Sequence, residues 1–234
     1  MKTLVVGMGK TGLSIARFLP WEGAGVLRTA DVEAADDRAA PPMAAEMRAL
    51  LGAERCHAGE DCREWPARRL REFGRVCISP GAPRDCAEKL CGGGAEALGE
   101  LSVLQKSFFG GGGLQKSFQG GGAVNPAIAA VTGTNGKSTV AALAAALCRA
   151  AGVYAQVVGN FGFPILDAWR EWGGGGGRSW ENLSVHQISP PAAAVMELSS
   201  FQLLYAPSAA DEKAGGAKKE GGGGVFGAGR GGDG

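Results

Sequence analysis

The stretch that decides the fold runs Ala127-Ile-Ala-Ala-Val-Thr-Gly-Thr-Asn-Gly-Lys-Ser-Thr139. An apolar run typical of a buried parallel strand leads into a turn with two glycines, and an alanine-rich helix is predicted directly after it, over 140–151. Free backbone N–H groups and the partial positive charge at a helix N-terminus favour a phosphate group. This order of strand, turn and helix therefore predicts a phosphate-binding loop in a parallel α/β domain.

The side chains of this loop suit ATP and Mg²⁺. The Lys137 ammonium can reach the β- and γ-phosphates, and the hydroxyl of Ser138 or Thr139 can ligate the metal. The usual P-loop has a further glycine where this sequence has Val131, so the motif is the shorter Gly-x-x-Gly-Lys-Ser form. The sequence predicts that ATP is bound by Gly133, Thr134, Asn135, Gly136, Lys137, Ser138 and Thr139.

Length and composition exclude several classes of protein. The 234 residues can form one large or two modest domains. A net charge of +1, from 24 basic and 23 acidic residues, argues against a nucleic-acid or membrane partner. No apolar run approaches the roughly 18 residues of a membrane span. Six cysteines without a Cys-x-x-Cys pair favour reduced thiols and a cytoplasmic location. A metal site formed by Cys56, His57 and Cys62 is a weaker alternative.

A second glycine motif, Gly7-Met-Gly-Lys-Thr-Gly12, lies near the start of the chain. It follows a short predicted strand, Thr3–Val6, and opens a helix with an apolar stripe. Asp31 follows Gly12 by 19 residues, at the end of a strand-like run around residues 26–27. Taken alone, these features predict a Rossmann-like domain that binds NAD or FAD, with Asp31 accepting a ribose hydroxyl. The alternative for Asp31 is a solvated carboxylate at a strand end.

Further elements complete an alternating α/β pattern. A helix is predicted over 43–51 and ends at Gly52. A strand over 75–78 leads into the turn Ser79-Pro-Gly-Ala-Pro83, and a strand over 153–158 leads into Gly159-Asn-Phe-Gly-Phe-Pro164.

A last predicted strand, starting at Ala192, ends in the carboxylate of Glu197. Because Mg²⁺ prefers one or two carboxylates together with phosphate oxygens and water, Glu197 is the candidate protein carboxylate for the metal. The alternative is that Glu197 caps a helix that starts at Ser199 and Ser200.

Glycine is concentrated in the second half of the chain, and the chain contains 41 glycines. The segment Leu104-Gln-Lys-Ser-Phe recurs at Leu114-Gln-Lys-Ser-Phe, and each copy is followed by a glycine run. Two copies with a period of ten residues cannot form a solenoid. Consecutive glycines have little to bury, so we predict a linker over 102–124 and a disordered tail over 209–234.

These motifs together resemble the Mur ligases, the ATP-dependent amino-acid-adding enzymes of peptidoglycan synthesis. The phosphate loop Thr132–Thr139, the turns 79–83 and 159–164, and Glu197-Leu-Ser-Ser-Phe-Gln202 carry the resemblance. The last string is similar to the D-glutamate-adding branch. The resemblance covers 1–101 and 125–208, less than half of a complete ligase, so the amino-acid-binding domain and a second metal ligand are not among these residues.

The resemblance implies the architecture and the substrates. Residues 1–101 are expected to form a Rossmann-like domain for the UDP part of a sugar nucleotide. Residues 125–208 are expected to form an incomplete P-loop-type parallel α/β ATPase domain. The implied reaction joins UDP-N-acetylmuramoyl-L-alanine and D-glutamate through an acyl phosphate, in a cytoplasmic monomer of the cell-wall pathway that serves cell shape and cell division.

The resemblance also implies site roles. Gly9, Lys10 and Thr11 would lie near the pyrophosphate, Asp31 near the uridine, and Asn160 against the sugar nucleotide. Lys137 and Glu197 would be catalytic, and the metal ligands would be Ser138 and Glu197.

Three other functions stay open. A folate-type amino-acid ligase shares the short phosphate loop, although the string Ser199-Ser-Phe-Gln202 argues against it. A nucleotide-dependent oxidoreductase would use Gly7–Gly12. A non-catalytic nucleotide-binding fragment would retain the loops without completing a reaction.

Overall fold

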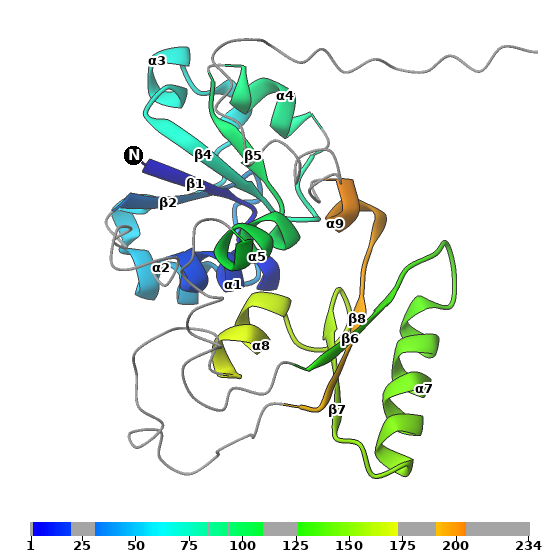
Figure 1. Cartoon of the computed structure of the whole chain (residues 1–234). Coiled ribbons are helices and arrows are strands. Elements are labelled where there is room, and N and C mark those ends of the chain that lie inside the picture. The colour runs from blue at the N-terminus through cyan, green and yellow to red at the C-terminus, as the bar shows by residue number, and fades with distance from the viewer. Residues whose placement is uncertain are drawn as a thin grey trace, which may run out of the picture.

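The computed structural model describes residues 2–19, 31–83, 85–92, 94–109, 126–172 and 191–204. It contains two parallel sheets, with strand orders β3-β2-β1-β4-β5 and β6-β8-β7 (Figure 1). The predicted α/β fold class is therefore confirmed.

The bounds of the first sheet and its helices follow the chain order. They are β1 (Lys2–Val6), α1 (Lys10–Phe18), β2 (Val32–Asp36), α2 (Ala44–Leu51), the 3₁₀ turn η3 (Ala53–Arg55), β3 (Cys56–Ala58), the 3₁₀ turn η4 (Cys62–Glu64), α3 (Ala67–Leu70), β4 (Phe73–Ile78), α4 (Cys86–Cys91), β5 (Glu96–Leu98) and α5 (Glu100–Phe109). The second sheet and its helices are β6 (Ala127–Val131), α7 (Lys137–Ala150), β7 (Ala155–Gly159), α8 (Ile165–Glu171), β8 (Ala193–Glu197) and α9 (Ser200–Leu204).

The first sheet is covered on both faces. Successive residues of β1 point to opposite sides, so Val5 packs into one hydrophobic cluster while Leu4 and Val6 pack into another. Residues of α1, α2 and α5 lie in the cluster with Val5, and residues of η4 and α4 lie in the other. The predicted helix 43–51 is confirmed as α2, and Gly52 follows it with φ of 96°.

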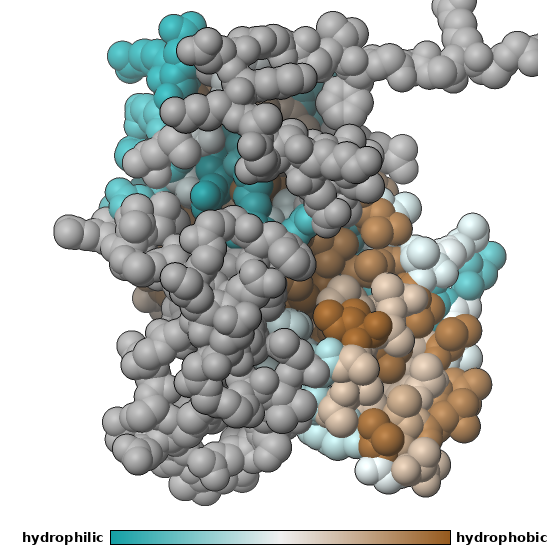
Figure 2. All heavy atoms as spheres, viewed as in Figure 1, coloured by the Kyte–Doolittle hydropathy of each residue, from teal (hydrophilic) through white to brown (hydrophobic). Residues whose placement is uncertain are grey.

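The second sheet is smaller than the first, with three strands instead of five. β8 lies in the middle, and α7 covers one face by burying Ala141 and Ala145. The prediction of a buried strand at 127–131 is half right. β6 is parallel, but among the described strands it pairs with β8 alone, at the edge of the sheet, and its Ile128 is 54% exposed. Figure 2 shows apolar residues gathered on the surface in this region of the molecule.

Helix α8 joins the two sheets into one structure, and it lies between α1 and the second sheet (Figure 1). The backbone N–H of Asp167 donates to Ser14 Oγ at 2.9 Å, and Leu166 is fully buried. One hydrophobic cluster contains residues from both sheets. The two predicted units therefore share a core.

A buried carboxylate strengthens this junction. Glu100, at the start of α5, accepts the Leu166 backbone N–H at 3.4 Å and the Gln202 amide at 3.2 Å. Burial raises the pKa of Glu100 to about 7 despite these two hydrogen bonds. The carboxyl group thus links α5 to α8 and α9.

The predicted linker 102–124 is wrong over 102–109. These residues belong to α5, because Val103 and Leu104 bury their side chains in the shared core. The remainder of that linker and the predicted tail 209–234 lie outside the described residues.

Two other expectations can be compared with the described ranges. None of the helices there is long and apolar enough to cross a membrane. The same ranges contain no group of three histidine, cysteine or acidic side chains able to hold a metal ion. His57 instead lies with Nε2 3.2 Å from Glu33 Oε2.

Candidate functional site

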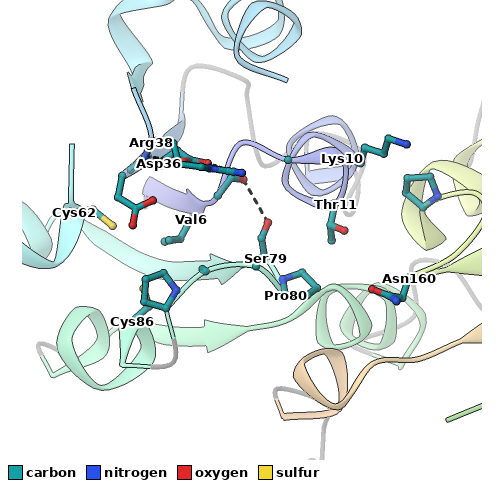
Figure 3. A pocket seen from close by; sticks show the side chains of 18 of the residues that line it. Val6, Lys10, Thr11, Asp36, Arg38, Cys62, Ser79, Pro80, Cys86 and Asn160 are labelled. Carbon is teal, nitrogen blue, oxygen red and sulfur yellow. Dashed lines mark hydrogen bonds and ion pairs between the residues drawn. The ribbon is translucent and has the colours of Figure 1, made fainter. Parts of the chain in front are cut away.

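A cavity of about 640 Å³ opens at the carboxyl ends of the strands of the first sheet (Figure 3). Its walls include the glycine turn after β1, the end of β2, residues around η4, the turn after β4 and, from the second sheet, the turn after β7. Four of the five residues predicted to bind the sugar nucleotide line it: Gly9, Lys10, Thr11 and Asn160. The carboxyl edge of a parallel sheet is the usual place for a ligand in such folds.

The glycine turn leaves room for a ligand at one specific position. A Cβ on Gly12 would lie 1.8 Å from the Gly7 carbonyl oxygen, so the third glycine is required by packing inside the protein. A Cβ on Gly9 would meet no atom within 4 Å, although Gly9 lines the cavity. Gly9 precedes the first residue of α1, where backbone N–H groups favour an anion. The turn therefore allows close backbone approach by a phosphate group.

The predicted position of Asp31 at the carboxyl end of the second strand is wrong. Strand β2 spans Val32–Asp36, so Asp31 comes just before the strand, at its amino end, and does not line the cavity. The run at residues 26–27 lies outside the described residues. The apolar pattern of 32–35 is interrupted by Glu33, so the sequence marks this strand only weakly. The carboxylate at the carboxyl end is Asp36, and the spacing rule alone did not find it.

Asp36 holds the glycine turn against β2. Its Oδ2 accepts the Met8 N–H and Arg38 Nη2, each at 2.7 Å, and its Oδ1 accepts Arg38 N at 3.0 Å and Nε at 2.8 Å. Burial disfavours ionisation, but the hydrogen bonds from Arg38 and Met8 hold the pKa of Asp36 below its ordinary value. A carboxylate has about four lone-pair positions, and four donors occupy these. Asp36 thus orients Arg38 at the cavity and keeps little capacity for a ribose hydroxyl.

The turn after β4 forms the opposite wall. The Ser79 N–H donates to the Val6 carbonyl at 2.9 Å, and its hydroxyl donates to the Gly7 carbonyl at 3.4 Å. Pro80, Gly81 and Pro83 line the cavity beside it. The turn predicted at 79–83 is therefore at a carboxyl strand end, and it fastens β4 to the glycine motif.

The predicted phosphate loop has the expected local geometry. It connects β6 to α7, Gly136 has φ of 75°, and the helix begins at Lys137, three residues before the predicted start. Lys137 Nζ donates to the Thr134 carbonyl at 3.2 Å. The loop is largely exposed and is not part of the 640 Å³ cavity.

Glu197 ends β8, between the phosphate loop and the turn that contains Asn160. Val131 and Gly159 are its register partners on the two neighbouring strands. The residue is 1% exposed; its Oε1 accepts the Asn160 amide at 3.0 Å, while its buried Oε2 has no hydrogen-bonding partner within the described ranges. A buried acceptor without a donor suits a cation, so the position fits a Mg²⁺ ligand.

The alternative role of Glu197 as a helix cap is wrong. Ser199 and Gln202 cap α9 by a reciprocal pair of hydrogen bonds. The Gln202 N–H donates to Ser199 Oγ at 3.2 Å, and the Ser199 N–H donates to Gln202 Oε1 at 3.0 Å. This is the Ser-x-x-Gln capping box. The N-terminus of α9 is therefore capped by Ser199 and Gln202 rather than by Glu197.

Comparison with known proteins agrees with these motifs. Residues 1–88 match the family model "Mur ligase MurD-like, N-terminal domain". The UDP-N-acetylmuramoylalanine--D-glutamate ligase of Thiobacillus denitrificans is 34% identical over 215 residues, which cover 86% of this chain and 38% of that ligase. The ligase of the same name from Chromobacterium violaceum is 32% identical over 203 residues, 85% of this chain and 37% of that ligase. The chain thus spans less than two fifths of the length of these relatives, and it belongs to the Mur ligase family.

Proposed function

We propose that this chain binds the UDP part of UDP-N-acetylmuramoyl-L-alanine in the 640 Å³ cavity and Mg²⁺-ATP at Gly133–Thr139. The activity served would be the ATP-dependent addition of D-glutamate in peptidoglycan synthesis. The names of the relatives support the D-glutamate ligase part, and the resemblance of the phosphate loop supports the use of ATP. The proposal rests on one observation: a residue in the wall of the cavity also contacts the candidate metal ligand. Asn160 lines the cavity and donates to Glu197, which ends the strand beside the phosphate loop.

Each site residue would have a distinct task. The N-terminus of α1 and Lys10 would hold the pyrophosphate, with Gly9 allowing close approach. Lys137 would stabilise negative charge on the phosphates of ATP, and Ser138 and Glu197 would hold Mg²⁺. When bound, the metal would offset charge on the transferring phosphoryl group. The residues of the chain thus supply positioning and electrostatics.

The proposal for the chain by itself is narrower. Amide formation needs D-glutamate held near attack distance, and such positioning is worth about 7–11 kcal/mol of the barrier. By the resemblance, the residues for that step belong to a part of the ligases that these 234 residues do not match. We expect slow ATP hydrolysis without D-glutamate addition. Ligation at an ordinary enzymatic rate by the purified chain would contradict this expectation.

Thermal denaturation in the presence of ligands tests the cavity. UDP-N-acetylmuramoyl-L-alanine should raise the melting temperature, and NAD should not, because the hydrogen bonds of Asp36 are already occupied by Met8 and Arg38. Gly9→Val is the matched variant, since its side chain would enter open space and the backbone there is extended. The variant should keep the melting temperature of the unliganded protein and lose the effect of the UDP compound. Protection by NAD alone would reverse the assignment to a dinucleotide site.

The ATP site has a separate test. Lys137→Ala should weaken Mg²⁺-ATP binding measured by calorimetry, because the loop loses its mobile cation. Arg149→Ala, at the far end of α7, is the control and should bind ATP as the unaltered chain does. Equal ATP affinities of Lys137→Ala and the unaltered chain would show that this loop does not bind the phosphates of ATP.

A further inference from the structure

The backbone of the turn after β7 packs directly against the end of β8. Gly159 has φ of 108°, and a Cβ there would lie 2.2 Å from the Glu197 carbonyl oxygen. The next residue, Asn160, donates its backbone N–H to that same carbonyl at 3.0 Å. The close approach fixes where the Asn160 side chain starts relative to Glu197.

The side chain of Asn160 then makes a second, directional contact. Its Nδ2 donates to Glu197 Oε1 at 3.0 Å. The amide thus turns its NH₂ group, which only donates, toward Glu197. The amide oxygen, which only accepts, remains on a residue that lines the cavity, on the same side as Thr11 and Pro80 (Figure 3).

The contact also leaves the two oxygens of Glu197 in different environments. Oε1 is occupied by Asn160, whereas Oε2 is buried without a donor from the described part of the chain. Rotation of the carboxylate out of this plane would break the hydrogen bond, and only a full exchange of the two equivalent oxygens restores it. The Asn160 amide therefore fixes the orientation of the carboxylate and the direction in which the oxygen without a donor points.

We infer that Asn160 is a positioning residue that orients the Glu197 carboxylate for the metal while its own amide oxygen accepts a hydrogen bond from an N–H or O–H group of the ligand in the cavity. This rests on the proposed function of the two sites. Residues that hold a metal ligand from behind typically change metal affinity by about 10–100-fold when they are removed. Because one amide contacts both sites, ligand binding and metal binding are coupled, and the coupling is reciprocal.

The first experiment uses Mn²⁺ as a spectroscopic probe for Mg²⁺. Mn²⁺ binding to the full chain, with a non-hydrolysable ATP analogue present, is measured by electron paramagnetic resonance. Asn160→Ala should raise the dissociation constant for Mn²⁺ by about tenfold or more. Phe161→Ala is the control, because Phe161 belongs to the same turn, is 46% exposed and has no polar group for Glu197. The control should keep the Mn²⁺ affinity of the unaltered chain.

The second experiment measures the coupling. The dissociation constant for Mn²⁺ is measured with and without saturating UDP-N-acetylmuramoyl-L-alanine. The unaltered chain should give two different values, whereas in Asn160→Ala the ratio of the two should approach one. A residue that only stabilises the turn would weaken neither the coupling nor the metal affinity in a protein that remains folded.

A third variant, Asn160→Asp, keeps the proposal testable if Asn160→Ala does not fold. Asn160→Asp places a second carboxylate beside Glu197, so the two charges repel until a cation lies between them. Mn²⁺ should therefore raise the melting temperature of Asn160→Asp by more than that of the unaltered chain. Equal Mn²⁺ affinities in Asn160→Ala and the unaltered chain, or equal melting shifts in Asn160→Asp, would overturn the positioning role alone. Failure of the unaltered chain to bind Mn²⁺ with the nucleotide would overturn the proposed ATP site and this inference with it.

Discussion

The two sheets of this protein differ in how completely they are covered. The five-stranded sheet buries side chains on both faces, and its carboxyl edge forms a cavity with closely packed walls. The three-stranded sheet packs α7 on one face, and β7 and β8 share a hydrophobic cluster with α8, but Ile128, Val140, Leu143 and Leu147 are each more than half exposed. The same kind of strand–turn–helix motif thus occurs in two settings. In the first sheet the motif is locked by neighbours, whereas in the second it depends largely on local geometry.

The largest effect is expected where the first sheet is most tightly packed. In Gly12→Ala the new Cβ would lie 1.8 Å from the Gly7 carbonyl oxygen, so the start of α1 must move away from β1. We expect a loss of about 3 kcal/mol or more in the free energy of unfolding, measured by urea denaturation. Gly9→Ala, three residues earlier, is the matched control and should cost little. A similar small loss in both variants would show that the glycine turn is not rigid.

The junction between the sheets should come next. Leu166 is fully buried in the cluster that both sheets share, so Leu166→Ala should lower the free energy of unfolding by about 2–5 kcal/mol. Leu147→Ala removes the same atoms from a side chain that is 61% exposed, and should cost far less. Equal losses would mean that the exposed face of α7 is packed in solution and would remove the contrast between the sheets.

The junction should also respond to pH through Glu100. Its pKa rises from 4.5 to about 7 on folding, so the folded state retains a proton that the unfolded state releases. Stability from this group is complete below pH 4.5 and is lost as the pH rises through 7. The loss amounts to about 3 kcal/mol at 1.36 kcal/mol per pH unit. Urea denaturation from pH 4 to 8 measures it.

Glu100→Gln should flatten this pH profile, because the amide does not titrate. Glu96→Gln, at an exposed carboxylate on β5, should leave the profile of the unaltered chain in place. An unchanged slope in Glu100→Gln would show that another group causes the pH dependence.

The smallest effect is expected on the exposed face of α7. Leu143 is 58% exposed, so Leu143→Gln should change the free energy of unfolding by no more than about 0.5 kcal/mol. Replacing an exposed leucine should also reduce self-association measured by light scattering. A loss above about 1.5 kcal/mol would show that this face is covered in solution.

The first sheet was predictable from sequence in its elements but not in all of its site residues. Apolar strands before glycine turns indicated β1 and β4, and the resemblance to the Mur ligases placed Gly9, Lys10 and Thr11 at one site. Asp36 was missed because its importance comes from hydrogen bonds to Met8 and Arg38, and the sequence pattern does not show which N–H groups converge on a carboxylate. The spacing rule pointed to Asp31, five residues too early.

In the second sheet, the site residues were predictable from sequence, but the burial of the strands and helices was not. The phosphate loop and Glu197 follow from local motifs, and both lie at carboxyl strand ends. Burial could not be predicted in the same way, because it depends on which elements pack on a strand; β6 has an apolar sequence but lies at an edge. The predicted linker included residues 102–109 of α5 because glycine runs follow them, although Val103 and Leu104 pack into the shared core.

The contact between α1 and α8 has a kinetic consequence. The glycine turn precedes α1 and the Asn160 turn precedes α8, and these helices are tied by Ser14 Oγ and the Asp167 N–H at 2.9 Å. Two walls of the cavity are therefore set by helices that already touch, rather than by a hinge that closes on the ligand. Little ordering entropy is left to lose on binding. Stopped-flow association of a UDP ligand should then show one phase, with a rate that increases linearly with ligand concentration and no slow isomerisation step.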